Sequence, residues 1–349
     1  MISTARPDLL GRCRAAGAIA LAVPILALAA CGDDEGSGSD GESQTLTVYS
    51  GREEEYVGPL FERLEEETGI EAEVRYGDSA ELAATIAEEG ENSPADVFFS
   101  QDAGSLGAVE AEGLLAALPD EVLDQVDPRY RSSAGEWVGT SGRARVVGYN
   151  VDAVTEGELP DSILEFADPE WEGRIGWAPT NGSFQAAVTA MRLTEGEDVT
   201  REWLEGIVAT GPEQFSDNEA IRDSIAAGEI DVGFLNHYYV AEARAEDPDY
   251  PVDVHFTSGD AGSLVNVAGI GVLASSDNQE TAAEFADHIL SEESQSYFAE
   301  TVKEYPLVEG VEVDPMVVPL SEFEQPDVDL SQLSDLEGTL KLLEEAGAL

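Results

Sequence analysis

The alternation of short apolar strands with helices constrains the fold of this chain more than any other feature of its sequence. An apolar stretch at residues 45–49 precedes a helical stretch at residues 56–68, which stops at Gly69. Further strands are predicted at residues 71–76 and 95–99. Strands that alternate with helices of about 10–15 residues are typical of parallel sheets flanked by helices. The predicted fold class is therefore α/β.

Polar segments follow several of the predicted strands or begin predicted helices. Ligands of open α/β sheets bind at the carboxyl ends of the strands, where such segments gather. We therefore expect a binding site among them; they are residues 50–53, Gln101, Asp102, Tyr149, residues 181–183, Asn218 and residues 236–239.

Two long apolar stretches indicate how the chain is divided. Residues 145–149 and 262–273 both have the pattern of long strands, and the segment between them has a strand–helix pattern of its own. We interpret the two stretches as crossovers that carry the chain into a second lobe and back. The predicted division is lobe 1 at residues 45–144 and 262–318, lobe 2 at residues 145–261, and a C-terminal segment at residues 319–349 that packs on both.

The N-terminus has the pattern of a secretory signal. A basic segment precedes an apolar run at residues 15–30, which is interrupted by Pro24 and is short for a membrane span of about 20 residues. The run ends at Leu28 to Cys31, which resembles the lipobox of bacterial lipoproteins. We expect a signal peptide at residues 1–30, then lipidated Cys31 at the start of a flexible tether at residues 31–44. An unlipidated signal peptide with an incidental cysteine is the alternative.

The charge of the chain excludes two classes of partner. The chain contains 73 acidic and 17 basic residues, and its formal net charge is −56. Binding to nucleic acid by counterion release needs a basic surface, and so does adsorption to anionic lipid. An acid-rich, lysine-poor surface suits a saline habitat, because the Debye length shrinks to roughly 3 Å at 1 M salt. Both cysteines, Cys13 and Cys31, fall in the signal or the lipidation site, so the mature body is predicted to contain no thiol chemistry.

Residues 236–239, Asn-His-Tyr-Tyr, lie between a predicted strand at 230–235 and a predicted helix at 240–246. The positive end of a helix dipole favours an anion at such a junction. A trivalent cation together with that dipole could deprotonate two neighbouring phenols, whose pKa is ordinarily about 10. The alternative is that the tyrosines are core or rim aromatics and that His237 is exposed.

Two further features could hold an oxyanion. Gly182 and Ser183 precede a predicted helix, where backbone N–H groups and a hydroxyl form a small cradle, although an ordinary helix cap has the same pattern. Arg52, Arg143 and Arg145 are scarce cations in an acidic chain. Each could clamp an oxyanion through its planar guanidinium group, or could simply form a surface ion pair.

Motifs of several enzyme classes are missing from the sequence. It contains no phosphate-binding Gly-x-x-x-x-Gly-Lys-Ser/Thr, no Gly-x-Ser-x-Gly nucleophile motif and no His-Glu-x-x-His metal motif. The runs of glutamate have the pattern of solvated helix faces. We therefore expect a binding protein rather than an enzyme.

From Thr45 to Leu349 the chain resembles the periplasmic ferric-iron-binding proteins of ABC transporters. The motifs that carry the resemblance occur in order along the chain, at residues 48–51, 88–90, 93–98, 141–147, 179–184, 228–231, 236–239 and 304–307. The resemblance implies the two-lobed type II solute-binding fold, in which each lobe is a mixed sheet flanked by helices and two crossover strands form the hinge.

The resemblance also implies roles for the candidate residues. Tyr238 and Tyr239 match the paired tyrosines that bind Fe³⁺ as phenolates in the family. A synergistic anion, carbonate or phosphate, is held in some members by a group of residues that match Asn181, Gly182, Ser183, Asn218 and Asn236. Fe³⁺ is a hard ion that prefers such oxygen donors.

The remaining ligands differ between members of that family. One scheme uses a histidine and a glutamate, whose positions are occupied here by Glu53 and Gln101, so that scheme is not intact. Another uses a third tyrosine, whose position matches Tyr149. Glu53 and Asp102 are possible carboxylate substitutes, and the implied metal ligands are therefore Tyr238, Tyr239, Tyr149 and Glu53. Arg52 or Arg143 would offset the charge of the anion.

These observations lead to one principal hypothesis and two rivals. The principal hypothesis is a monomeric, lipid-anchored extracytoplasmic receptor that captures Fe³⁺ between its lobes and delivers it to an ABC permease with its ATPase. The first rival is a transport receptor for a small organic or oxyanion solute, such as a phosphonate, that binds without metal. The second is an extracellular hydrolase, which the missing nucleophile motifs disfavour.

Overall fold

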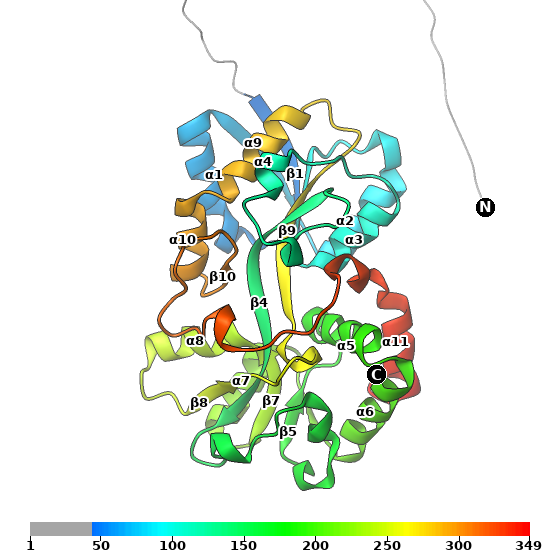
Figure 1. Cartoon of the computed structure of the whole chain (residues 1–349), viewed down its shortest axis with the longest axis vertical. Coiled ribbons are helices and arrows are strands. Elements are labelled where there is room, and N and C mark those ends of the chain that lie inside the picture. The colour runs from blue at the N-terminus through cyan, green and yellow to red at the C-terminus, as the bar shows by residue number, and fades with distance from the viewer. Residues whose placement is uncertain (1–43) are drawn as a thin grey trace, which may run out of the picture. The chain divides into compact units, whose positions relative to one another are not determined.

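The structure, a computed structural model, describes residues 44–349 (Figure 1). The predicted signal peptide, the lipidation site at Cys31 and nearly all of the tether lie outside the described residues. Within the described part of the chain, no helix has both the length and the apolar character needed to cross a membrane.

Ten strands form one mixed sheet in the order β2-β1-β3-β9-β4-β7-β5-β6, with β8 and β10 each paired to β4. The strands are β1 (Gln44–Ser50), β2 (Ile70–Tyr76), β3 (Val97–Ser100), β4 (Trp137–Asn150), β5 (Ile175–Trp177), β6 (Glu213–Gln214), β7 (Val232–Asn236), β8 (Val252–His255), β9 (Val265–Val272) and β10 (Tyr305–Pro306). β1 is parallel to β2 and β3, and β5 is parallel to β6 and β7, whereas β4 and β9 run antiparallel to their neighbours.

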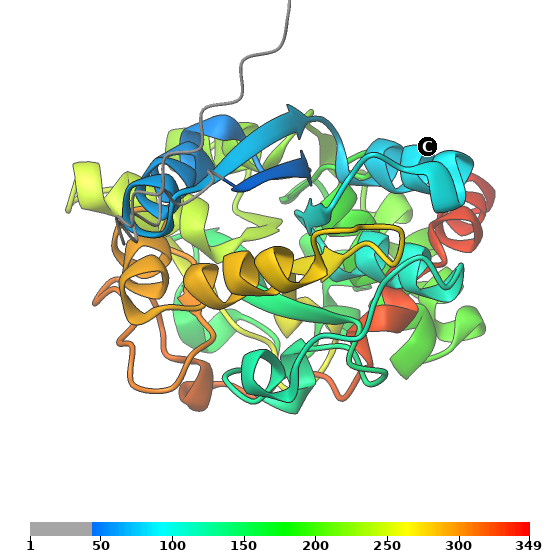
Figure 2. The same ribbon diagram turned by 90° about the horizontal axis from the view of Figure 1, so that it is seen from above.

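Helices flank this sheet, and Figure 2 shows α1 and α2 on opposite sides of the strands β1 and β2. The α-helices are α1 (Glu54–Thr68), α2 (Ser79–Glu89), α3 (Ala103–Ala111), α4 (Asp120–Leu123), α5 (Gly182–Thr194), α6 (Glu197–Ala209), α7 (Asn218–Ala227), α8 (His237–Glu246), α9 (Gln279–Ile289), α10 (Glu292–Glu300) and α11 (Leu336–Glu345). The 3₁₀ helices are η1 (Gly90–Asn92), η2 (Pro128–Tyr130), η3 (Glu156–Glu158), η4 (Ile163–Ala167), η5 (Pro169–Trp171), η6 (Ala261–Ser263), η7 (Leu320–Glu322) and η8 (Leu330–Ser334).

The α/β class predicted from the sequence is confirmed, and the first three strands lie where the pattern placed them. Helix α1 begins two residues before the predicted start and ends before Gly69, which adopts φ 77° and closes the last turn. The apolar periodicity of residues 333–348 also predicts a C-terminal helix. The observed helix is shorter, because residues 330–334 form the 3₁₀ helix η8 and α11 begins only at Leu336.

Strand β4 belongs to both halves of the sheet (Figure 1). Its residues Trp137 to Ala144 pair with β9, whereas Arg145 to Tyr149 pair with β7. The change of partner falls between Ala144 and Arg145. We refer below to the first half-sheet (β2-β1-β3-β9 with the start of β4) and the second half-sheet (the end of β4 with β7-β5-β6).

Each half-sheet has an aromatic core beside its strands. In the first, Phe61 of α1 packs on Phe285 of α9 with 5.5 Å between ring centroids. In the second, Trp203 of α6 and Phe166 pack on Phe234 of β7, each with ring centroids 5.8 Å apart. These buried contacts fix the strands whose carboxyl ends carry the candidate site.

Candidate functional site

A cleft of about 910 Å³ opens where residues of the two half-sheets face each other. Its walls include residues that follow β1 and β3 on one side and residues that follow β5 and β7 on the other. Nine of the predicted site residues line it; they are Glu53, Arg143, Asn181, Gly182, Ser183, Asn218, Asn236, Tyr238 and Tyr239. The structure therefore brings together most of the residues that the sequence singled out.

The first turns of α2, α3, α5, α7 and α8 contribute residues to this cleft. The positive end of each helix dipole lies at its first turn, so the cleft favours negative charge. Aspartate side chains already cap three of these helices, α2, α3 and α7. The cap of α5 is the neutral Asn181, and Asn236 at the start of α8 makes no capping bond. The second half-sheet therefore keeps more uncompensated positive potential at the cleft.

Tyr238 and Tyr239 lie side by side in the first turn of α8, with ring centroids 4.2 Å apart. Tyr238 is 7% exposed and Tyr239 is half-buried. Burial is the main cause that raises the pKa of both phenols above its usual 10, while the nearby Arg143 charge acts in the opposite direction. Both tyrosines are therefore protonated in the metal-free protein at neutral pH. A cation that binds to their phenolate oxygens must displace those protons.

Arg145 is a buried cation of the cleft; its arginine pattern made it a possible oxyanion clamp, but the family resemblance did not place it among the implied anion ligands. It is 4% exposed, and its Nη1 donates to Ser183 Oγ at 3.1 Å, Asn218 Oδ1 at 3.2 Å and Asn236 Oδ1 at 3.1 Å. Its Nη2 is buried without a hydrogen-bond partner. Burial lowers the pKa of Arg145 to about 10, so the guanidinium group stays charged at neutral pH. A buried, charged donor without a partner fits an oxyanion in the cleft.

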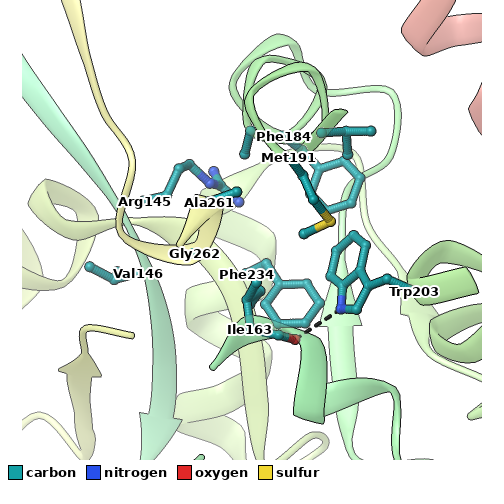
Figure 3. A pocket seen from close by; sticks show the side chains of 11 residues that line it. Arg145, Val146, Ile163, Phe184, Met191, Trp203, Phe234, Ala261 and Gly262 are labelled. Atoms are coloured by element: carbon teal, nitrogen blue, oxygen red, sulfur yellow. Dashed lines mark hydrogen bonds between the residues drawn. The ribbon is translucent and has the colours of Figure 1, made fainter. Parts of the chain in front are cut away.

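Behind Arg145 lies a small cavity of about 20 Å³, shown in Figure 3. Its other walls are mainly apolar and include Phe184, Trp203 and Phe234. These walls offer the guanidinium group no negative charge, so any compensating anion has to come from the cleft side. The sequence signal for Arg145 was its scarcity as a cation in an acidic chain, and its spacing from Arg143 places the two on one face of a strand.

Arg143 also lines the cleft, on the first half-sheet. Its Nη2 donates to the backbone oxygen of Gln101, and its Nε lies 4.0 Å from a carboxylate oxygen of Glu304. Arg143 therefore adds positive charge near the tyrosine pair.

Arg52, a predicted anion ligand, does not line the cleft. Its side chain is 1% exposed, and its two terminal nitrogens donate to Glu304 at 2.9 and 3.2 Å. Nη1 also donates to Gln101 Oε1 at 3.0 Å. A guanidinium group that is buried and paired in this bidentate way is already neutralised.

Tyr149, the predicted third tyrosine ligand, does not lie beside the tyrosine pair and does not line the cleft. Asn236, at the start of α8, faces Arg145 across the β4–β7 ladder, whereas Tyr149 faces Val232. Four residues along a strand correspond to roughly 13 Å. The cause is strand direction: β4 runs antiparallel to β7, so the carboxyl end of β4 lies at the edge away from the cleft.

The remaining oxygen donors of the first half-sheet differ in availability. Asp102 accepts hydrogen bonds from the backbone N and the hydroxyl of Ser105 at 2.8 and 2.9 Å, and Gln101 accepts from Arg52. Glu53 is exposed at the cleft and makes no capping bond at the start of α1. Within residues 44–349, no cluster of three or more His, Cys, Asp or Glu side chains could hold a metal.

The alternative interpretation of the Asn-His-Tyr-Tyr segment required an exposed His237. Instead His237 is 3% exposed, and burial lowers its pKa to about 4. The tyrosines, by contrast, line the cleft.

A comparison with protein families matches residues 92–331 to the family described as bacterial extracellular solute-binding protein. The chain belongs to this family. Among other members, it is similar to the Fe(3+)-binding periplasmic protein of Serratia marcescens, with 33% identity over 88% of this chain and 91% of the relative. It is also similar to iron uptake protein A1 of Synechocystis sp., with 32% identity over 92% of each chain.

Solved structures of this solute-binding family agree with the fold. Iron-bound HitA from Pseudomonas aeruginosa superimposes with a TM-score of 0.80 and 32% identity, over 87% of this chain and 99% of the other. A Trichodesmium protein in complex with iron and citrate ligands gives a TM-score of 0.78 and 28% identity over the same shares. The type II periplasmic binding fold expected from the sequence is thus confirmed.

Proposed function

We propose that this protein is an extracytoplasmic receptor that captures Fe³⁺ in the cleft and delivers it to an ABC permease. The observation that carries the proposal is the pair Tyr238 and Tyr239, adjacent at the start of α8 in a cleft that also holds the buried, incompletely bonded Arg145. The names of the similar proteins, which include periplasmic iron-binding and iron-uptake proteins, support the same cargo.

The donor chemistry supports a hard trivalent ion. Phenolate oxygens suit Fe³⁺, and the cleft-lining residues offer no thiolate or imidazole to a softer metal. Two phenolates leave one positive charge on the ion, and Arg143 and Arg145 add two more. A bound dianion reduces this excess charge, which a partly desolvated site requires. We therefore include a synergistic anion, carbonate or phosphate, in the proposed site.

Each residue of the proposed site has a separate role. Tyr238 and Tyr239 bind the ion, and Glu53 supplies a carboxylate from the opposite wall when the lobes close. The anion lies against the start of α5, where Arg145 Nη2 donates to it. The other anion-site residues are Arg143, Asn181, Gly182, Ser183, Asn218 and Asn236.

The proposal includes the organisation of the receptor around this site. Lobe 1 at residues 45–144 and 262–318 and lobe 2 at residues 145–261 would close about the crossover strands. Lipidated Cys31 would hold a monomer at the outer face of the membrane, beside a permease powered by an ATPase. Its task is binding and delivery, not catalysis.

The test is to add Fe³⁺ with bicarbonate to the purified metal-free protein. Phenolate bound to Fe³⁺ gives a visible charge-transfer band, so we expect a coloured complex with one iron per chain. Tyr238→Phe and Tyr239→Phe should each weaken iron retention at least about tenfold. Tyr149→Phe is the matched control, because it removes a phenol outside the cleft, and it should retain iron like the parent.

The anion is tested in the same assay with Arg145→Gln. This variant should lose the dependence of colour on bicarbonate or phosphate. A colourless parent protein that nevertheless bound a phosphonate would favour the metal-free oxyanion receptor instead. Iron binding that survived both tyrosine substitutions would show that the ligands had been assigned wrongly.

A further inference from the structure

The buried side chain of His237, next to the tyrosine pair, connects three separate segments of the chain. Its Nδ1 lies 3.1 Å from the backbone nitrogen of Ala144, in β4. Its Nε2 lies 3.0 Å from the backbone oxygen of Lys303. Its ring stacks on Tyr305 of β10, with 4.5 Å between centroids and 25° between planes. These contacts leave neither ring nitrogen free.

The two hydrogen bonds fix the state of the ring. Because the Ala144 N–H is a donor, Nδ1 must be an acceptor and carries no proton. The proton therefore lies on Nε2, which donates to the Lys303 carbonyl. His237 is a neutral ring that bonds to backbone groups on both sides, an arrangement that holds its orientation about the helix axis.

The attachment point on β4 is the place where that strand changes partner. Ala144 is the last residue that pairs with β9, and Arg145 is the first that pairs with β7. The His237 side chain, at the start of α8, thus accepts a hydrogen bond from the backbone of β4 at the junction of the two half-sheets.

The other attachment point belongs to the first half-sheet. Lys303 has φ 58°, the only positive φ of a non-glycine residue in the described part of the chain. Such a conformation is costly and persists only where surrounding contacts hold it. The next residue, Glu304, pairs with Arg52, and Tyr305 pairs with Gly142 of β4. The segment 303–305 is therefore anchored independently of α8.

We propose that His237 is a positioning residue for iron binding: it ties the first turn of α8 to the junction in β4 and to the segment 303–305, and so holds Tyr238 and Tyr239 facing Arg143. This inference rests on the proposed function. His237 does not contact the ion; it sets the orientation of the helix turn that carries both ligands. Supporting bonds of this kind typically change metal affinity about 10–100-fold when they are removed.

Three variants separate the contributions of the ring. His237→Phe keeps the stacking on Tyr305 and removes both hydrogen bonds. His237→Asn places an acceptor near the Nδ1 position, and His237→Gln places a donor near the Nε2 position. His255→Phe is the matched control, because His255 also bonds a backbone oxygen, that of Pro160 at 2.7 Å, but lies outside the cleft lining.

The readouts are the rate of iron release to excess chelator, the wavelength of the charge-transfer band and the melting temperature. We expect His237→Phe to bind iron, to release it at least about tenfold faster than the parent and to shift the band. His237→Asn and His237→Gln should each recover part of the loss, and His255→Phe should release iron at the parent rate.

Two results would overturn the inference. One is a His237→Phe variant that melts at a lower temperature but keeps the release rate and band of the parent, since the role would then be structural alone. If that variant does not fold, parent-like release from both His237→Asn and His237→Gln has the same meaning. A parent protein that stays colourless with Fe³⁺ and bicarbonate would instead overturn the proposed function, and this inference with it.

Discussion

At the scale of single residues, the cleft combines two protonated phenols with two buried guanidinium groups. Burial raises the pKa of Tyr238 and Tyr239, and it leaves Arg145 charged. The metal-free tyrosine pair therefore holds two protons that a cation must displace. Iron loading by this site is consequently linked to proton release.

The first prediction is that iron affinity falls steeply as the pH falls. Both tyrosine pKa values lie above 10, so at any pH below that the free protein holds both protons and the loaded protein holds neither. The apparent affinity should then drop about 100-fold for each pH unit lost, or tenfold per proton. Competition with a chelator, corrected for the chelator's own protonation, measures this slope. Tyr239→Phe should show about half the slope in logarithmic units, and a pH-independent parent would contradict the prediction.

Local sequence patterns correctly placed cleft residues whose position depends on the adjacent strand and helix. They did not place residues whose position or pairing depends on segments far away in the sequence. Tyr238, Tyr239 and Asn181 lie at strand-to-helix junctions, which periodicity reveals. Arg52 lies at a similar junction, but Glu304 neutralises it from 252 positions further along the chain. Tyr149 was misplaced because strand direction in the sheet is a tertiary property.

At the scale of elements, the C-terminal segment contacts helices of both halves of the molecule. η8 packs on α3 of the first half, where Gly104 and Gly107 allow backbone to approach backbone. α11 packs on α5 of the second half, where the hydroxyls of Thr189 and Thr339 lie 2.7 Å apart. Helical periodicity predicted α11, but the 3₁₀ turn before it arises from packing on α3.

The second prediction concerns this contact. A methyl group at Gly107 would overlap the backbone oxygen of Ser331, so Gly107→Ala should lower the free energy of unfolding by about 1–3 kcal/mol. Urea titration measures the change. Gly157→Ala is the matched control, because its added methyl group meets open space and its φ is not positive. Equal midpoints for the Gly107→Ala variant and the parent would show that η8 does not pack as described.

At the scale of the whole molecule, the formal net charge of −56 dominates the behaviour in solution. Seventeen basic residues cannot pair with 73 acidic ones, and several arginines are already used inside the fold. Repulsion among the unpaired carboxylates opposes the compact state wherever salt does not screen it.

The third prediction is that salt stabilises the protein. Between about 0.05 and 1 M KCl the melting temperature should rise by roughly 5 °C or more, which corresponds to a few kcal/mol for a chain of this size. Most of the gain should appear below about 0.5 M, where the Debye length changes most. Sucrose of equal osmolality controls for solute exclusion. A melting temperature that stayed flat or fell with salt would rule out self-repulsion as the main opposing force.

The change of partner along β4 has a mechanical consequence. Arg143 precedes that point and pairs with β9, whereas Arg145 follows it and pairs with β7. Bending of the β4 backbone at Ala144 would change the distance between the guanidinium groups of Arg143 and Arg145. A ligand bound to both groups would oppose that bending. A ligand that contacts both guanidinium groups would therefore couple occupancy of the cleft to the bend of β4 at Ala144.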